Sequence, residues 1–247
     1  MDFLSLLGVT IAFAAIIAGN FLDGGSLGAL VNYPAALIVV GGTLGATILQ
    51  TPYGVLKRAG QLLSWMLFPP SVSEEALVKR ILNLSKIARK DGLLGLENVA
   101  DNEKNRLLRK GLLLLADGYE PERIRQRLEE EVEHQERQDI RAANIFDHMG
   151  GYAPTIGIIG AAMGLIHVMG NLDQPEKVGA GIATAFVATI YGVGLANLLL
   201  YPIAGKLREI LHDAMSSKTL LVEGVIAIAE GEHPKAIESR LNALMRS

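Results

Sequence analysis

The sequence predicts an all-α, polytopic membrane protein with four transmembrane helices and a helical cytoplasmic domain. Half of its 247 residues are hydrophobic and only 20% are charged, with a mean hydropathy of +0.31. This composition is typical of a membrane protein that also has a substantial soluble part. Long stretches without charge alternate with segments whose apolar residues recur at helical spacing, and no strand pattern of any length occurs.

Uncharged stretches predict where the chain crosses the membrane. Asp, Glu, Lys and Arg are absent from residues 3–22, 24–56, 148–172 and 178–205. A spanning helix needs roughly 20 mostly apolar residues, so each stretch can supply one. We expect the four spans near residues 3–21, 34–53, 153–171 and 181–203. The first apolar run follows no basic segment of the signal-peptide type, so we expect it to be retained as a span.

The basic residues predict the orientation of these spans. Of 23 Lys and Arg, none precedes Lys57, sixteen lie between residues 57 and 150, one is Lys177, and six follow residue 205. Because basic residues concentrate on the cytoplasmic side, we expect both termini there. The predicted segments are 1–56 (spans one and two), 57–150 (cytoplasmic helical domain), 151–205 (spans three and four) and 206–247 (cytoplasmic helical tail).

The cytoplasmic segment reads as a series of helices. Ser71 with Glu74 fits a capping box that opens a helix ending at Asp91. Pro121 suits the first turn of a long charged helix, which we expect to continue into span three without a full break.

Missing motifs exclude several classes of protein. The chain has no cysteine, and therefore no disulfide, thiolate metal site or cysteine nucleophile. It contains no phosphate-binding loop and no metalloprotease motif, so we expect neither an enzyme nor a cofactor. A net charge of −3 gives no reason to expect nucleic acid as a partner. His134, within EVEHQE, could in principle bind a metal, but we expect it on an exposed helix face.

The predicted spans contain almost nothing that titrates. Among Asp, Glu and His they hold only His167, which we expect to be neutral, hydrogen-bonded and near the outer end of span three. A proton relay within a membrane normally uses a chain of such groups. If an ion crosses here, a partner must supply the missing carboxylate.

Small residues recur in three of the spans. They are Gly41, Gly42, Gly45 and Ala46, then Gly157, Gly160, Ala161 and Gly164, then Ala183, Ala185, Ala188, Gly192 and Gly194. Such residues let helices approach closely in lipid. We expect part of this packing within the chain and part against neighbouring subunits or a partner's helix.

Three segments of the chain carry a resemblance to a known family. Residues 153–207 read APTIGIIGAAMGLIHVMGNLDQPEKVGAGIATAFVATIYGVGLANLLLYPIAGKL, and residues 24–48 read GGSLGALVNYPAALIVVGGTLGATI. The first resembles the third and fourth spans of the flagellar stator A-subunits of the MotA/PomA family, and the second resembles their first outer loop and second span. ARKDGLLGLE is similar to their cytoplasmic segment. The more distant relatives ExbB and TolQ share the character of the last two spans but have three spans.

The resemblance implies an assembly in the bacterial inner membrane. It implies a homo-pentamer around two copies of a single-span, peptidoglycan-binding B-subunit (MotB/PomB-like), which carries one membrane aspartate. Ion flow between them would turn the ring against a rotor switch protein (FliG-like). Membrane lipid surrounds the spans, and the ion is the only small species involved.

The resemblance also implies roles for residues in the spans. Pro154 and Pro202 match prolines that matter for coupling, and a proline can mark a flexing point, although Pro154 could merely begin a helix. Thr189 matches a threonine that faces the partner's aspartate, although its hydroxyl could instead bond back to its own helix. Ala161 stands where sodium-type members carry threonine, and His167 lies where proton-type members carry histidine. Both favour H⁺ over Na⁺ as the transported ion.

Three charged residues match the rotor-contacting segment of the family. Arg89, Lys90 and Glu97 flank the predicted helix end, and surface charges of both signs suit a contact that forms and releases repeatedly. An ordinary solvated surface is the alternative. Two other functions stay open for the whole chain: an ExbB/TolQ-like energiser of outer-membrane processes, and an uncoupled membrane channel or scaffold.

Overall fold

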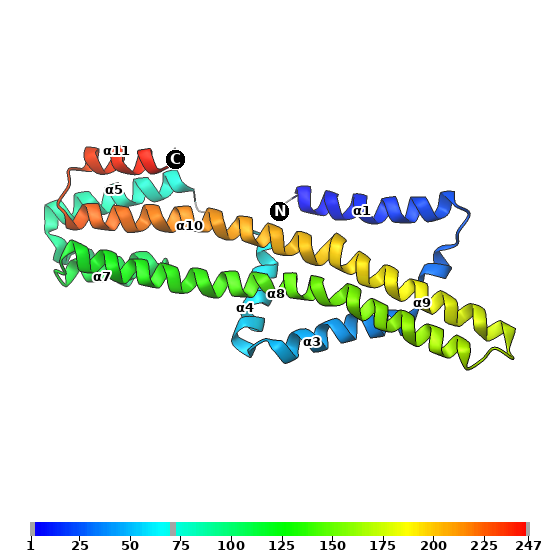
Figure 1. The fold of residues 1–247 in the computed structure, drawn as a ribbon. Coiled ribbons are helices and arrows are strands. Elements are labelled where there is room, and N and C mark those ends of the chain that lie inside the picture. The colour runs from blue at the N-terminus through cyan, green and yellow to red at the C-terminus, as the bar shows by residue number, and fades with distance from the viewer. Residues whose placement is uncertain (1–2, 70–72, 246–247) are drawn as a thin grey trace. The chain divides into compact units, whose positions relative to one another are not determined.

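The chain is helical throughout the residues that its computed structural model describes, 3–69 and 73–245, and no strand occurs among them (Figure 1). The predicted all-α class is therefore confirmed. The helices fall into two compact units. Unit 1 comprises Met1–Pro69 and Asp139–Arg208, and unit 2 comprises Pro70–Gln138 and Glu209–Ser247.

Unit 1 contains the apolar helices. They are α1 (Phe3–Leu22), the 3₁₀ turn η1 (Leu27–Leu30), α2 (Tyr33–Ala36), the π-helical η2 (Leu37–Gly41), α3 (Gly42–Gln50), α4 (Tyr53–Leu67), the second part of α8 (Pro121–Met169), α9 (Pro175–Leu195), the π-helical η4 (Ala196–Leu200) and the start of α10 (Tyr201–Ala229). The backbone angles at the junctions between α2, η2 and α3 are helical, and so are those between α9, η4 and α10. Each of these two series is therefore one continuous helix that contains a short π-helical segment.

Three stretches are long and apolar enough to cross a membrane, by length and composition. They lie within Leu27–Gln50, Pro121–Met169 and Lys177–Ala229. The first predicted span corresponds to α1, whose apolar part, Leu6–Leu22, is shorter. The whole of α1 has 20 residues without a charged side chain and extends about 30 Å, similar to a bilayer's apolar core. By length and hydropathy, three of the four predicted spans thus correspond to long apolar helices within the described residues, and the first predicted span is not confirmed.

The second predicted span ends at Gln50 instead of residue 53. Thr51 is extended (φ −113°, ψ 127°) because the following Pro52 disfavours a helical conformation in the residue before it. The chain then enters the amphipathic helix α4, which the sequence patterns did not predict. Pro52 lies at its N-cap, where the missing N–H has no cost.

The long helix α8 confirms the predicted continuity between the charged segment and span three. It runs without interruption from Pro121 to Met169, with Pro154 inside it. Pro154 therefore does not begin a helix, and that alternative is excluded.

Unit 1 exposes most of its apolar side chains. No residue of α1 is buried among those whose side chains the structure describes, and Leu22 and Leu49 are 86% and 90% exposed. Surfaces of this kind suit lipid as the surrounding solvent. The buried residues Ala35, Val39, Val187 and Ala188 form a small core between the second span and α9.

Unit 2 is built around an ordinary apolar core. Its elements are α5 (Glu74–Asp91), η3 (Leu93–Leu96), α6 (Glu97–Asp101), α7 (Arg106–Ala116), the first part of α8, the end of α10, and α11 (Pro234–Leu244). Ile81, Leu112, Leu128, Val225 and Ile237 have no exposed surface. Each comes from a different helix, so one contiguous core holds five helices together.

Local signals explain the ends of α5. The hydroxyl of Ser73 accepts a hydrogen bond from the N–H of Ala76 at 3.2 Å and caps the helix. Ser71, the cap predicted from the sequence, lies outside the described residues. The helix ends at Asp91 as predicted, because Gly92 adopts φ 75°, a conformation that favours glycine.

Candidate functional site

The helices α8 and α9 of unit 1 approach each other at backbone distance. A β-carbon added at Gly192 would lie 2.5 Å from the carbonyl oxygen of Ala153, and one at Gly157 would lie 2.8 Å from that of Ala188. A β-carbon at Gly164 would lie 2.8 Å from the backbone nitrogen of Ala185. Only glycine fits at these positions, and the predicted close packing of small residues is confirmed for this pair of helices.

The second span packs against the same pair of helices. A β-carbon at Gly160 would lie 2.8 Å from Cβ of Ala188 and 3.4 Å from Ile38, and one at Gly42 would lie 2.8 Å from Ile156. By contrast, a β-carbon added at Gly41, Gly45 or Gly194 would have no neighbouring group within 4 Å in the described part of the chain. The chain's own packing therefore accounts for some of the predicted small residues and leaves others facing away from its own helices.

Thr189 and Ala161 lie on the facing helices of this group. Thr189 is half-buried on α9, and its Cα would be 3.5 Å from a β-carbon at Gly157. Its hydroxyl donates to the carbonyl of Ala185 at 3.3 Å, so the bond back to its own helix is present. The oxygen can still accept a hydrogen bond from another group. Ala161, half-buried one turn beyond Gly157, offers only a methyl group.

Pro154 lies in the tightest part of this packing. Its Cα would be 3.1 Å from a β-carbon at Gly192. The proline lacks an N–H, so the carbonyl of Gly150, four residues earlier, receives no helical hydrogen bond from it. This local weakness makes the helix easier to bend at the point where it contacts α9.

Pro202 follows the π-helical segment η4. The N–H of Tyr201 donates to the carbonyl of Ala196, a spacing of five residues. Pro202 is exposed in the first turn of α10, directly after this wide turn. A π segment next to a proline is a second place where this long helix can bend.

His167 is separate from this packing. It is exposed in the last turn of α8. The hydrogen bond expected for its side chain is not formed within the described part of the chain, because the exposed ring faces no polar group of the neighbouring helices. Only its backbone carbonyl is engaged, by the side-chain amide of Asn171 at 2.7 Å.

Tyr191 has a role that the sequence patterns did not indicate. Its hydroxyl donates to the carbonyl of Leu30 at 2.5 Å and accepts from the N–H of Asn32 at 3.2 Å. The side-chain amide of Asn32 donates to Thr184 at 2.8 Å, and its oxygen caps α2. These bonds fix the start of the second span to α9. The signal available in the sequence was a polar residue, Asn32, just before the second span together with a tyrosine within the fourth.

The three predicted rotor-contact residues lie around one bend in unit 2. Arg89 and Lys90 occupy the last turn of α5, and Glu97 begins α6, with Gly92 between them. All three are exposed and form no ion pair with any other described residue. They therefore form a charged surface without internal partners, available to an external one.

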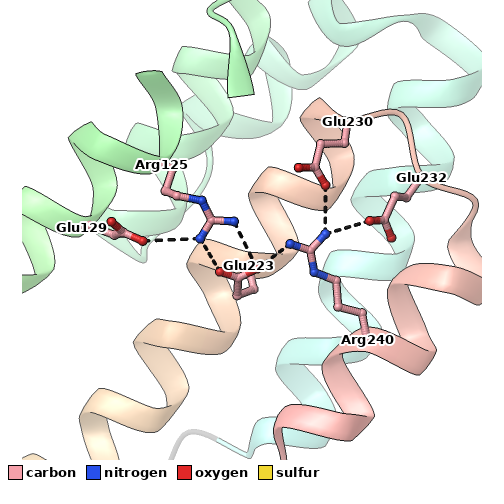
Figure 2. Close-up of polar contacts among 6 residues, drawn as sticks. All are labelled: Arg125, Glu129, Glu223, Glu230, Glu232 and Arg240. Carbon is pink, nitrogen blue, oxygen red and sulfur yellow. Dashed lines mark hydrogen bonds and ion pairs between the residues drawn. The ribbon is translucent and has the colours of Figure 1, made fainter. Parts of the chain in front are cut away.

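A network of ion pairs contrasts with these free charges. Figure 2 shows Glu223 between two guanidinium groups: Arg125 of α8 donates to it at 2.5 Å, and Arg240 of α11 at 2.7 Å. Arg240 also donates to Glu230 at 2.8 Å and to Glu232 at 2.7 Å. The network ties α8, α10 and α11 together across unit 2.

The network shifts the pKa values of its members. Burial alone would raise the pKa of Glu223, but the hydrogen bonds and charges of Arg125 and Arg240 outweigh it and leave that pKa below its usual value of 4.5. The hydrogen bond to Glu230, foremost, and those to Glu223 and Glu232 raise the pKa of Arg240.

Glu223→Gln is expected to lower the free energy of unfolding of the purified subunit by about 1.5–3 kcal/mol at neutral pH. A carboxyl whose folded pKa is depressed stabilises the protein above its unfolded pKa and loses that effect as pH falls through the folded value. The midpoint temperature of thermal unfolding of the native chain should therefore fall as pH drops below 4.5, and it should fall less in the variant. Glu133→Gln is the matched control, since its pair with Arg137 is 2.7 Å long but exposed. Equal losses in both variants would contradict the prediction.

No group of three or more potential metal ligands occurs among residues 3–69 and 73–245. Where α8 and α9 pack together, the polar groups described above are hydroxyl and backbone carbonyl oxygens.

Comparisons with known proteins agree on one family. Residues 99–219 match the MotA/TolQ/ExbB proton channel family, and residues 6–92 match the N-terminal region of motility protein A. Motility protein A of Bacillus subtilis is 35% identical over 98% of this chain and 90% of its own length. Chemotaxis protein PomA of Vibrio alginolyticus is 33% identical over 98% of this chain and 94% of its own.

Two solved structures resemble the whole chain. A chain of C. jejuni MotAB superposes with a TM-score of 0.90 at 30% identity, covering 99% of this chain and 96% of that one. A chain of the flagellar MotAB stator complex from Bacillus subtilis gives 0.84 at 34% identity, covering 95% and 92%.

Proposed function

The chain belongs to the MotA/TolQ/ExbB proton channel family, and we propose that it is the ion-conducting stator subunit of a bacterial flagellar motor. The similarity of its whole length to chains of solved MotAB complexes carries this proposal. The match of residues 6–92 to motility protein A favours the flagellar motor over the ExbB/TolQ energisers. Members of a channel family are not enzymes, and this chain is not one.

The proposed subunit crosses the inner membrane four times, with both termini in the cytoplasm. α1, with 20 uncharged helical residues, supplies the first span. The distribution of Lys and Arg supports this orientation. Segments 57–150 and 206–247 then form the cytoplasmic part.

The proposed assembly is a pentamer around a single-span B-subunit. The uncharged spans carry no carboxylate, so the ion-binding aspartate comes from that partner. Gly41, Gly45 and Gly194, which the chain's own packing leaves open, suit close contact with neighbouring helices. Thr189 can accept a hydrogen bond from the partner's carboxyl group when that group is protonated.

The proposed ion is H⁺. A hard cation such as Na⁺ needs several oxygen ligands, and Ala161 provides none. A proton requires only one acceptor at a time, which a carboxylate supplies. His167, exposed near the predicted outer end of span three, could receive protons there.

Torque would pass from the spans to the cytoplasm along the two long helices. Protonation of the partner's aspartate would change the packing beside Pro154, and the bends at Pro154 and Pro202 would let α8 and α10 transmit the movement. Arg89, Lys90 and Glu97 would then push on the rotor's switch protein through charge pairs that form and release.

Swimming of cells that rely on this subunit and its partner should persist in sodium-free medium and stop when a protonophore is added. Cells lacking the subunit are the control and should not swim in either medium. A requirement for sodium would refute the proton assignment, and Thr189 would become the foremost oxygen ligand. Motility independent of the subunit would favour the energiser function, and ion flux without any partner aspartate would favour an uncoupled channel.

A further inference from the structure

A polar cavity lies in unit 1 where the second span ends. Its volume is about 160 Å³. Gln50 and Thr51 line it at the end of that span, and Arg141, Asn144 and His148 line it from α8. The three α8 residues are spaced at i, i+3 and i+7, so they lie on one face of the helix.

The lining has an unbalanced charge. It includes one arginine and one histidine but no carboxylate. The other two arginines of unit 1 are paired, Arg58 with Asp139 at 2.6 Å and Arg208 with Asp147 at 2.7 Å. Arg141 is exposed and has no hydrogen bond or ion pair within residues 3–69 and 73–245. An arginine beside a polar cavity without an acidic partner is suited to an anionic ligand.

The position of the cavity along the helices indicates which kind of anionic ligand it can bind. Gln50 ends the apolar stretch of the second span, and His148 begins the uncharged stretch of the third. The cavity therefore lies where apolar helix surface gives way to charged surface, at the depth of lipid headgroups. Basic pockets at the cytoplasmic ends of spanning helices attract anionic headgroups.

We infer that this cavity binds the phosphate group of an anionic phospholipid of the cytoplasmic leaflet. Arg141 provides two parallel N–H donors to the phosphate oxygens, and Asn144 and His148 each provide one further donor. The lipid would tie the cytoplasmic end of the second span to α8. The inference rests on the membrane orientation proposed above but not on the identity of the transported ion.

Retention of phosphatidylglycerol by the complete subunit complex tests this inference. Native mass spectrometry would follow the lipid during titration of complexes purified in mild detergent. Arg141→Gln should weaken retention about tenfold, because a charge-assisted pair is lost. Arg141→Lys should keep most of it, because the charge is preserved. Arg137→Gln is the matched control: the same change on the same helix, at an exposed residue paired with Glu133 and outside the cavity. It should stay within about twofold of the native complex.

Equal retention in the native and Arg141→Gln complexes would overturn the inference. Complete competition by inorganic phosphate at the same concentration would identify a site for soluble phosphate and overturn the lipid assignment. Cross-linking of Arg141 to a carboxylate of a neighbouring subunit would also overturn the lipid assignment, because the arginine would then have a protein partner. Motility in the protonophore assay is read independently, so failure of the lipid site and failure of the stator function are distinguishable.

Discussion

Gly192→Ala is expected to destabilise the assembled subunit and to reduce swimming speed at least tenfold. The new β-carbon would lie 2.5 Å from the carbonyl oxygen of Ala153 and 3.1 Å from Cα of Pro154, both backbone atoms that cannot rotate away. Forcing the helices apart costs about 1–3 kcal/mol by analogy with overpacked cores. The gain in helix propensity, about 1 kcal/mol, offsets only part of that. The midpoint of thermal unfolding of the purified complex and the swimming speed measure the two effects.

Gly179→Ala provides the matched control for this prediction. Gly179 lies on the same helix, outside the proposed contacts with other subunits, and no described atom is within 4 Å of a β-carbon at this position. The control should keep the native unfolding midpoint. If both variants unfold at the same temperature, the contact between α8 and α9 does not limit stability, and the account of the packing given above is wrong.

The second large effect is expected at Thr189. Thr189→Val keeps the size of the side chain but removes the hydroxyl that donates to Ala185 at 3.3 Å. If this oxygen accepts a hydrogen bond from the partner's carboxyl group, its loss costs about 1.5–3 kcal/mol in the conducting state. Proton flux through complexes in vesicles should therefore fall at least tenfold. Assembly should be unchanged, because the residue is only half-buried and keeps its shape.

Two further variants separate a role in conduction from a role in packing. Thr189→Ser retains the hydroxyl and should keep most of the flux. Thr47→Val removes a hydroxyl that bonds back to its own helix in the same way, to Thr43 at 2.7 Å, but in the second span. Its flux should stay within about twofold of the native value. Equal loss in Thr47→Val and Thr189→Val would show a general effect of removing hydroxyls from spans.

Local sequence patterns were sufficient to predict the all-α class and the positions of most of the long helices. Uncharged stretches identified the apolar helices, because charge is costly in lipid wherever a residue lies along the chain. The continuity of α8 and the end of α5 at Asp91 also follow from near neighbours in the sequence. The break at Pro52 was missed, although it too is local, because the uncharged stretch continues to residue 56.

The composition of the spans predicted close packing but did not specify the partner of each small residue. Gly192 and Gly194 look equivalent in the sequence, yet a β-carbon at Gly192 would meet the backbone of α8, and one at Gly194 would meet no described residue of another helix. Which face of a helix meets its neighbour depends on the register in which the two helices cross, and that register depends on contacts between distant segments.

The long-range polar contacts were also decided only by the tertiary structure. Tyr191 bonds to the backbone of Leu30, 161 residues away, and Arg125 pairs with Glu223, 98 residues away. The sequence by itself determined the helices, the uncharged character of the spans and the absence of a membrane carboxylate in them. The tertiary structure alone decided which glycines join α8 to α9, which segments Tyr191 connects, and which arginine of unit 1 has no carboxylate partner among the described residues. The reason is that hydrogen bonds and ion pairs form between groups that folding brings together.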